Sequence, residues 1–114
     1  MNKNNQPICE ICTSGTKRWY LDNKVFHRED GPAIEYAVGT KCWYLYGQRH
    51  RENGPAIENA NGYKSWYLHD QLHRLDGPAI ECVDGPKYWY YYGKHIDCDS
   101  QEEFERLIKL KYLW

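Results

Sequence analysis

The stretch GTKCWYLYGQRHRENGPAIENAN, residues 39–61, recurs with few changes as GYKSWYLHDQLHRLDGPAIECVD, residues 62–84. A related version, GTKRWYLDNKVFHREDGPAIEYAV, covers residues 15–38, and the truncated version GPKYWYYYGKHID covers residues 85–97. The tryptophans at positions 19, 43, 66 and 89 are separated by 24, 23 and 23 residues. A fixed period in the low twenties is typical of stacked repeat folds, so this region predicts three full units and a fraction.

Each unit predicts β-strands rather than a helix. Aromatic-rich runs of strand length lie at 17–21, 41–45, 64–68 and 87–91, and short extended runs that begin at a proline lie at 32–37, 55–60 and 78–83. The fold class expected is therefore mainly all-β, with stacked hairpins that form an elongated antiparallel sheet or solenoid. Period-2 alternation predicts a core ladder of Trp19/Leu21, Trp43/Leu45 and Trp66/Leu68 with Ile34, Ile57 and Ile80.

Two turns per unit are expected. Asn61-Gly62 and the equivalent Asp84-Gly85 supply the positive φ angles that a tight hairpin needs. A second turn, at 46–47 and 92–93, leads into a brief strand that carries His-Arg. The first unit holds one extra residue, which predicts a bulge or a wider turn near residues 25–26.

The carboxyl end changes character. In DSQEEFERLIKLKYLW, Ser100 is followed three residues later by Glu103, which is the spacing of a capping box. Apolar residues at 104, 107 and 108 then share one helical face. We expect a capping helix within residues 98–114, after repeats at 15–38, 39–61, 62–84 and 85–97. Residues 1–14 show no periodicity and are expected either to be flexible or to cover the opposite end.

The composition excludes some classes of protein. There are 11 Tyr and 5 Trp but only 2 Phe, and the net charge is −1. Nucleic-acid-binding domains usually carry a basic excess, which is missing here. The amino terminus lacks the apolar core of a signal peptide, and no run is long enough to span a membrane. The five cysteines are then expected to be reduced thiols in a cytoplasm.

The repeated text, close to W-Y-L-x-G-x-x-H-R-x-D-G-P-A, resembles MORN-type repeats in the variant form found in bacteriophages and large DNA viruses. The ending YWYYYGKHIDCDSQEEFERLIKLKYLW is similar to the closing cap of such proteins. The resemblance covers roughly residues 15–114. It implies a phage or viral accessory protein that acts in the host cytoplasm. The Y-x-G-x-W opening and paired glycines of classical MORN repeats are absent, so their junctional and lipid-associated roles are not expected.

The phrase His-Arg-x-acid-Gly-Pro looks like a reactive constellation when it is read once. An active site is assembled once from unlike residues, whereas a phrase present in every unit serves what every unit needs. We therefore interpret it as the joint of the repeat, with a ligand-facing ladder as the lesser alternative. The turn residues assigned in this way are His27, Arg28, Asp30, His50, Arg51, Asn53, His73, Arg74 and Asp76.

Cys9 and Cys12 have the spacing of half a zinc site or of a redox pair. No second Cys-x-x-Cys follows, so ordinary thiols are preferred and no cofactor is expected. Completion of a zinc site by Cys98 and His95 would require the two ends of the chain to meet, and a symmetric dimer could form a site from two Cys-x-x-Cys pairs.

Binding is expected at aromatic and non-repeated positions. Tyrosine and arginine are enriched at interaction surfaces, and the tyrosine face is either such a surface or a second packed layer. The candidate binding residues are Tyr20, Tyr44, Tyr46, Tyr67, His69, Tyr90, Tyr92 and Arg49.

These features favour a non-enzymatic repeat protein that binds a host or viral protein, and a homo-oligomer is compatible with them. The alternative is an anti-defence protein that sequesters a small nucleotide signal or inhibits a host defence nuclease. No catalytic residue and no membrane contact is expected.

Overall fold

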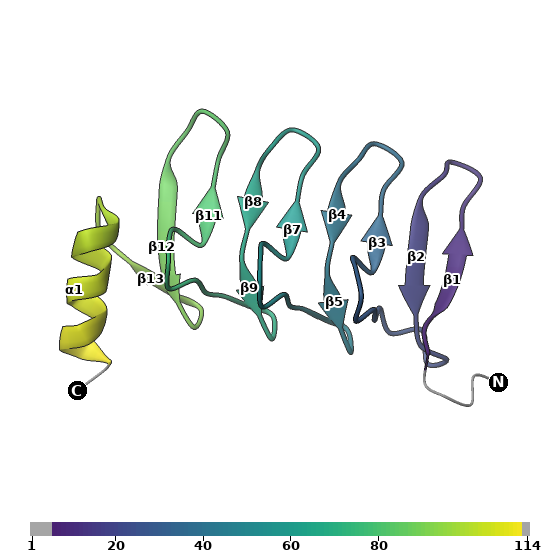
Figure 1. Ribbon diagram of the computed structural model, residues 1–114, viewed down its shortest axis with the longest axis horizontal. Coiled ribbons are helices and arrows are strands. Elements are labelled where there is room, and N and C mark those ends of the chain that lie inside the picture. Colours follow the sequence, from purple (N-terminus) through teal and green to yellow (C-terminus); the bar gives the residue numbers. More distant parts are fainter. Residues whose placement is uncertain (1–5, 113–114) are drawn as a thin grey trace.

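The computed structural model describes residues 6–112 as one long, thin β-layer of 50 × 33 × 17 Å with a helix at its carboxyl end (Figure 1). The strands and the helix are β1 (Ile8–Ile11), β2 (Lys17–Tyr20), β3 (Ile34–Glu35), β4 (Lys41–Cys42), β5 (Tyr44–Leu45), β6 (Gln48–Arg49), β7 (Ile57–Glu58), β8 (Lys64–Ser65), β9 (Tyr67–Leu68), β10 (Gln71–Leu72), β11 (Ile80–Glu81), β12 (Lys87–Tyr91), β13 (Lys94–Ile96) and α1 (Gln101–Lys111).

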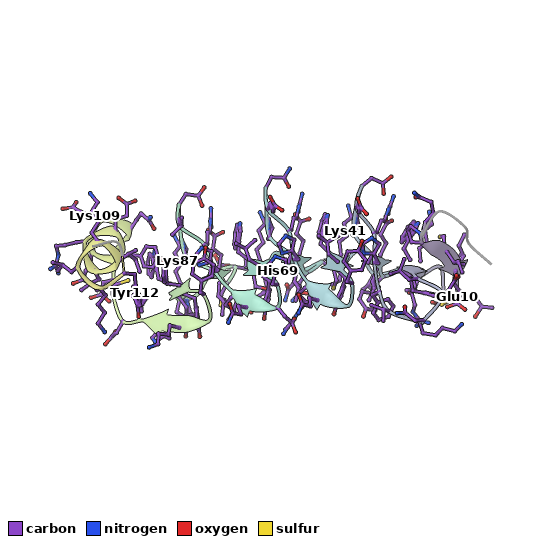
Figure 2. The ribbon with its side chains drawn as sticks, turned by 90° about the horizontal axis from the view of Figure 1, so that it is seen from below. Glu10, Lys41, His69, Lys87, Lys109 and Tyr112 are labelled. Atoms are coloured by element: carbon purple, nitrogen blue, oxygen red, sulfur yellow. The ribbon has the colours of Figure 1, made fainter. Side chains whose placement is uncertain are left out.

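Nine strands form one open antiparallel sheet in the order β1-β2-β3-β4-β7-β8-β11-β12-β13. β5 pairs with β6 and β9 pairs with β10 in two separate small sheets. The predicted mainly-β fold of stacked hairpins with a carboxyl-terminal helix is confirmed. Seen from below, side chains stand on both faces of the layer, with Glu10 near one end and Tyr112 at the other (Figure 2). No helix within residues 6–112 is long and apolar enough to cross a membrane.

The aromatic runs at 41–45 and 64–68 are not the continuous strands that were expected. Each run breaks at its tryptophan, since the first half joins the large sheet and the second half joins a small one. The backbone of Trp43 forms hydrogen bonds with two different segments of its unit. Its N–H donates to the carbonyl of Ala56 at 2.7 Å, and its carbonyl accepts from the N–H of His50 at 3.1 Å. The strand is therefore interrupted at each of these tryptophans, whereas β12 runs on through Trp89.

Both predicted turns form, with two corrections. Gly62 has φ 98°, but Gly85 does not take a positive φ, because it precedes Pro86 and that position favours extended backbone. The brief strands after the second turn end before the His-Arg pair, at residues 49 and 72. The extra residue of the first unit is absorbed in a wider turn, where the N–H of Leu21 donates to the carbonyl of Val25 at 2.9 Å.

The two ends of the chain differ from each other. The amino-terminal segment contains β1, which pairs with β2 and so extends the sheet. At the other end the N–H of Glu103 donates to Ser100 Oγ at 3.1 Å, as a capping box requires. The Glu103 carboxylate accepts from Asp99 N–H rather than from Ser100 N–H. The expected segments 1–14 and 98–114 begin and end in residues that lie outside the described range.

The predicted core ladder is confirmed only at Ile34, which is 5% exposed. The tryptophans and leucines of the first three units are only half-buried, as are Ile57 and Ile80. The apolar position that is fully buried in every full unit is that of Ala33, Ala56 and Ala79, each 0% exposed. A single layer of strands has no second sheet to cover these larger side chains. The apolar core proper lies at the carboxyl end, where Trp89, Ile96, Phe104 and Ile108 pack together.

Candidate functional site: two grooves between the repeats

The repeated arginine lies over the ring of the repeated tryptophan of its own unit. The guanidinium carbons of Arg28, Arg51 and Arg74 are 3.8, 3.7 and 3.7 Å from the ring centres of Trp19, Trp43 and Trp66. This arrangement is a cation–π contact, and it covers one side of a ring that the thin sheet leaves open.

Each of these arginines also stabilises the turn that follows it, through hydrogen bonds to groups of that turn. Arg74 donates to the carbonyl of Pro78 at 3.1 Å and to the carboxylates of Asp76 at 2.9 Å and Glu81 at 2.8 Å. In the second unit Asn53 replaces the aspartate, and Arg51 keeps its bonds to the Pro55 carbonyl and to Glu58. A side chain at Gly77 would meet the Arg74 guanidinium at 2.6 Å, which explains the glycine of the phrase.

The glutamates at 35, 58 and 81 therefore form ion pairs with the repeated arginines. In the sheet they stand opposite lysines, with Glu58 paired in register to both Lys41 and Lys64. The ion pairs within the described residues, however, join these glutamates to Arg28, Arg51 and Arg74.

The repeated histidine is buried and joins its unit to the next one. The ring Nδ1 atoms of His27, His50 and His73 accept the backbone N–H groups of residues 46, 69 and 92, at 3.0, 2.9 and 2.8 Å. Because Nδ1 accepts, the ring proton lies on Nε2 and the histidine is neutral. Burial lowers the pKa of His73, which favours the same neutral form.

Three of the predicted binding residues occupy these joints. Tyr46, His69 and Tyr92 take positive φ angles of 48°, 46° and 45°, which non-glycine residues rarely adopt. Their rings lie 4.2, 4.3 and 3.8 Å from the rings of His27, His50 and His73. One face of each ring is thus used within the molecule. His69 lies near the middle of the array in Figure 2, which views the molecule from below.

The remaining predicted tyrosines are half-buried and have neighbours of their own. Tyr44 packs beside Phe26 with ring centres 5.5 Å apart, and Tyr90 packs beside His95 at 5.3 Å. Lys24 Nζ lies 5.0 Å from the ring centre of Tyr20. Tyr20, Tyr44, Tyr67 and Tyr90 therefore resemble a packed second layer more than a free surface.

Arg49, also predicted to bind a partner, is engaged inside the molecule. Its guanidinium lies 4.2 Å from the ring centre of Tyr67 and forms an ion pair with Asp70. The hydrogen bond between them lowers the pKa of Asp70 and raises the pKa of Arg49.

The structure brings no metal site together around Cys9 and Cys12. Among residues 6–112 no group of three or more His, Cys, Asp or Glu side chains is placed to hold a metal ion. Cys9 lies on β1, whereas His95 and Cys98 lie at the opposite end of the sheet (Figure 1). The described cysteines are free thiols.

Two grooves lie between successive His-Arg turns. Groove 1, of about 700 Å³, has Trp43 and Leu45 among its lining residues, together with the turns at 28–31 and 50–53. Groove 2, of about 560 Å³, has Trp66 and Leu68 with the turns at 51–54 and 73–76. We expected these tryptophans and leucines to be core. The sequence could have indicated their exposure, because the repeats contain no further apolar strands that could form a second layer over these side chains.

The next position along the array is closed by the chain itself. Trp89, Tyr91 and Ile96 lie 23 residues after Trp66, Leu68 and His73, and α1 packs Phe104 and Ile108 against this end. Gln101 accepts from Trp89 Nε1 at 2.8 Å and donates to the carbonyl of Leu75 at 2.8 Å. Trp89 is 7% exposed as a result.

The equivalent polar groups of the two grooves have no such partner. Within residues 6–112, the Nε1 atoms of Trp43 and Trp66 and the carbonyls of Glu29 and Glu52 form no hydrogen bond with protein atoms. Grooves 1 and 2 are thus open versions of a surface that α1 covers once.

No family model, no curated protein and no solved structure matches this chain.

Proposed function

We propose that this chain is a non-enzymatic binding protein that takes a protein partner along grooves 1 and 2. The observation that carries the proposal is that the chain covers the third equivalent surface with its own helix and leaves the other two open. A half-buried tryptophan beside a leucine is a typical anchor for a protein contact.

The chemistry of the repeated phrase supports a binding role rather than catalysis. The histidine Nδ1 and the arginine guanidinium of each full unit are occupied by backbone groups and carboxylates of the scaffold. Neither group is left available as a base or as an anion clamp. The resemblance to MORN-type repeats of phages and viruses adds the proposal that the partner is a host or viral protein met in the cytoplasm.

A protein partner is preferred over a nucleotide because of charge. Glu29 and Glu52 border groove 1 without a cationic partner of their own, and such carboxylates oppose the approach of phosphate groups.

A matched pair of variants tests the proposal. Leu75 is 55% exposed at groove 2, and Leu110 is 52% exposed on α1, so Leu75→Ser and Leu110→Ser make the same change at nearly equal exposure. In a pull-down from host lysate, L75S is expected to lose most of a stoichiometric protein that wild type and L110S both recover. Equal recovery by both variants would place the contact elsewhere, and recovery of no protein by wild type would argue against the proposal.

A further inference from the structure

The charges around groove 1 do not balance locally. Arg28 is paired with Asp30 and Glu35, and Arg51 is paired with Glu58, so the two cations at this groove are already neutralised. Glu29 and Glu52 have only histidines as partners, through Nε2 at 3.2 and 3.3 Å. Those histidines are neutral because Nδ1 accepts a backbone N–H. The groove therefore carries two carboxylates without a compensating positive charge.

These carboxylates are presented to solvent. The side chains of Glu29 and Glu52 are 76% and 82% exposed, and both residues line groove 1 beside Trp43 and Leu45. Exposed carboxylates beside Trp43 and Leu45 suit a long cationic side chain, whose aliphatic stem packs on apolar surface while its head reaches a carboxylate.

The molecule uses the same combination repeatedly for its own arginines. Arg51 lies on Trp43 and pairs with Glu58, and Arg49 lies on Tyr67 and pairs with Asp70. A cation held between an aromatic ring and a carboxylate is thus a contact that this scaffold already forms at several places.

Groove 2 has a different chemistry at the same positions. Leu75 replaces the glutamate that the first two units carry, so groove 2 has Glu52 at one wall and an exposed leucine at the other. Each unit contributes two strands to the large sheet, which spaces equivalent positions by about 10 Å. The neighbouring grooves therefore favour different side chains at a fixed separation.

We infer that groove 1 binds an arginine or lysine side chain of the protein partner, and that groove 2 binds an apolar side chain about 10 Å away along the same partner segment. This inference rests on the proposed function and names the chemistry of the partner at the grooves: a basic peptide segment with an adjacent apolar residue.

Short labelled peptides test the charge preference directly. The probes are two fluorescein-labelled nine-residue peptides, one of arginine and leucine and the other of glutamate and leucine in the same pattern, followed by fluorescence polarisation. The arginine peptide is expected to bind wild type and the glutamate peptide is not. Preference for the glutamate peptide, or no binding of the arginine peptide, would overturn the inference. The proposed function would still be judged by partner recovery with L75S and L110S.

The variant Glu29→Gln/Glu52→Gln removes the two charges, and its amides can still accept from the histidine Nε2–H groups. Its matched control is Asp84→Asn/Glu102→Gln, which removes the same charge from two exposed positions that do not line the grooves. We expect E29Q/E52Q to weaken binding of the arginine peptide by about tenfold, and the control to weaken it by about twofold or less. Equal losses would show a general charge effect and contradict the site.

A gain-of-charge variant keeps the inference testable if E29Q/E52Q is destabilised. Leu75→Glu restores at an exposed position the glutamate of the first two units. Binding of a nine-residue peptide of arginine and glycine, which has no leucine for Leu75 to contact, is expected to tighten by about threefold or more, because groove 2 then gains the second carboxylate of groove 1. An unchanged affinity in L75E would contradict the role assigned to these rim glutamates.

Discussion

Trp66 and Trp89 hold the same position in consecutive units, yet Trp66 borders an open groove and Trp89 is buried. Trp66 is covered on one side by a polar side chain, the Arg74 guanidinium, which is held by backbone and carboxylate oxygens. Trp89 is covered by apolar side chains of α1. The His73-Arg74 pair of the open unit is replaced by Ile96-Asp97 in the closed one. A change of two residues therefore accompanies the change from an open groove to a terminal cap.

The largest loss of stability is expected from a substitution at the closed end, where α1 covers Trp89. Phe104→Ala removes a side chain that is 1% exposed at the centre of this cluster, so it should lower the free energy of unfolding by about 3–5 kcal/mol. Chemical denaturation measures this change. Leu110→Ala, on the exposed side of α1, should change it by no more than about 0.5 kcal/mol. Similar losses in the two variants would mean that α1 does not close the array through Phe104.

A smaller loss is expected at the open unit. Arg74→Met keeps an unbranched side chain on Trp66 but removes the guanidinium, its bond to the Pro78 carbonyl and its pairing with Glu81. The expected cost is about 2–3 kcal/mol. Arg106→Met, at an exposed arginine with one long ion pair, serves as the control and should cost about 0.5 kcal/mol or less. If R74M lowered the free energy of unfolding no more than R106M does, the Arg74 guanidinium over Trp66 would not contribute to stability.

The smallest effect concerns pH. The pKa of His73 is lowered from 6.5 by burial, so the unfolded chain binds this proton more readily than the folded chain does. The contribution of His73 to stability is therefore fully present above pH 6.5 and is lost as the pH falls toward the lowered folded-state pKa. Protonation at Nδ1 also removes the acceptor for the Tyr92 N–H. The loss is bounded at about 1.4 kcal/mol per pH unit for one group.

Replacing His73 by isoleucine, the residue at the equivalent position 96, isolates the pH-dependent contribution of His73 to stability. His73→Ile should flatten part of the decline in melting temperature between pH 7 and pH 5, although its stability at pH 7 will be lower because the bond to Tyr92 is gone. His95→Ile changes an exposed histidine and leaves His73 in place, so it should keep the wild-type profile. An unchanged slope in H73I would show that His73 does not carry the acid sensitivity.

The sequence was sufficient for the fold because the period is a local property of the chain. Each sequence feature used for the fold predicts backbone structure close to it in the chain. The recurring tryptophan predicts a strand, the glycines predict turns, and the Ser100–Glu103 spacing predicts the start of a helix. The break of the strands at Trp43 and Trp66 could not be read in this way. It depends on which neighbour each half of the run pairs with, and that is a contact between segments distant in sequence.

The candidate site was harder to predict for the same reason. The repeated phrase suggested a joint, but the cation–π contact of Arg51 with Trp43 links two residues that sequence patterning treats as a charged surface and an apolar core. Arg49, assigned to binding, pairs with Asp70 of the next unit, 21 residues away. Periodicity identifies positions that are equivalent, but it does not say which of their faces are already occupied.

The histidine bonds have a consequence for how such a chain can grow. Each Nδ1 reaches a backbone N–H 19 residues further along, and the offset is the same at all three joints. An in-frame duplication of one 23-residue unit would reproduce every one of these bonds without any compensating substitution. The array is therefore modular, and its length can change by gene duplication while the closing helix stays at the end. Each added copy would bring one more groove, whose rim could differ from its neighbours as Leu75 differs from Glu52.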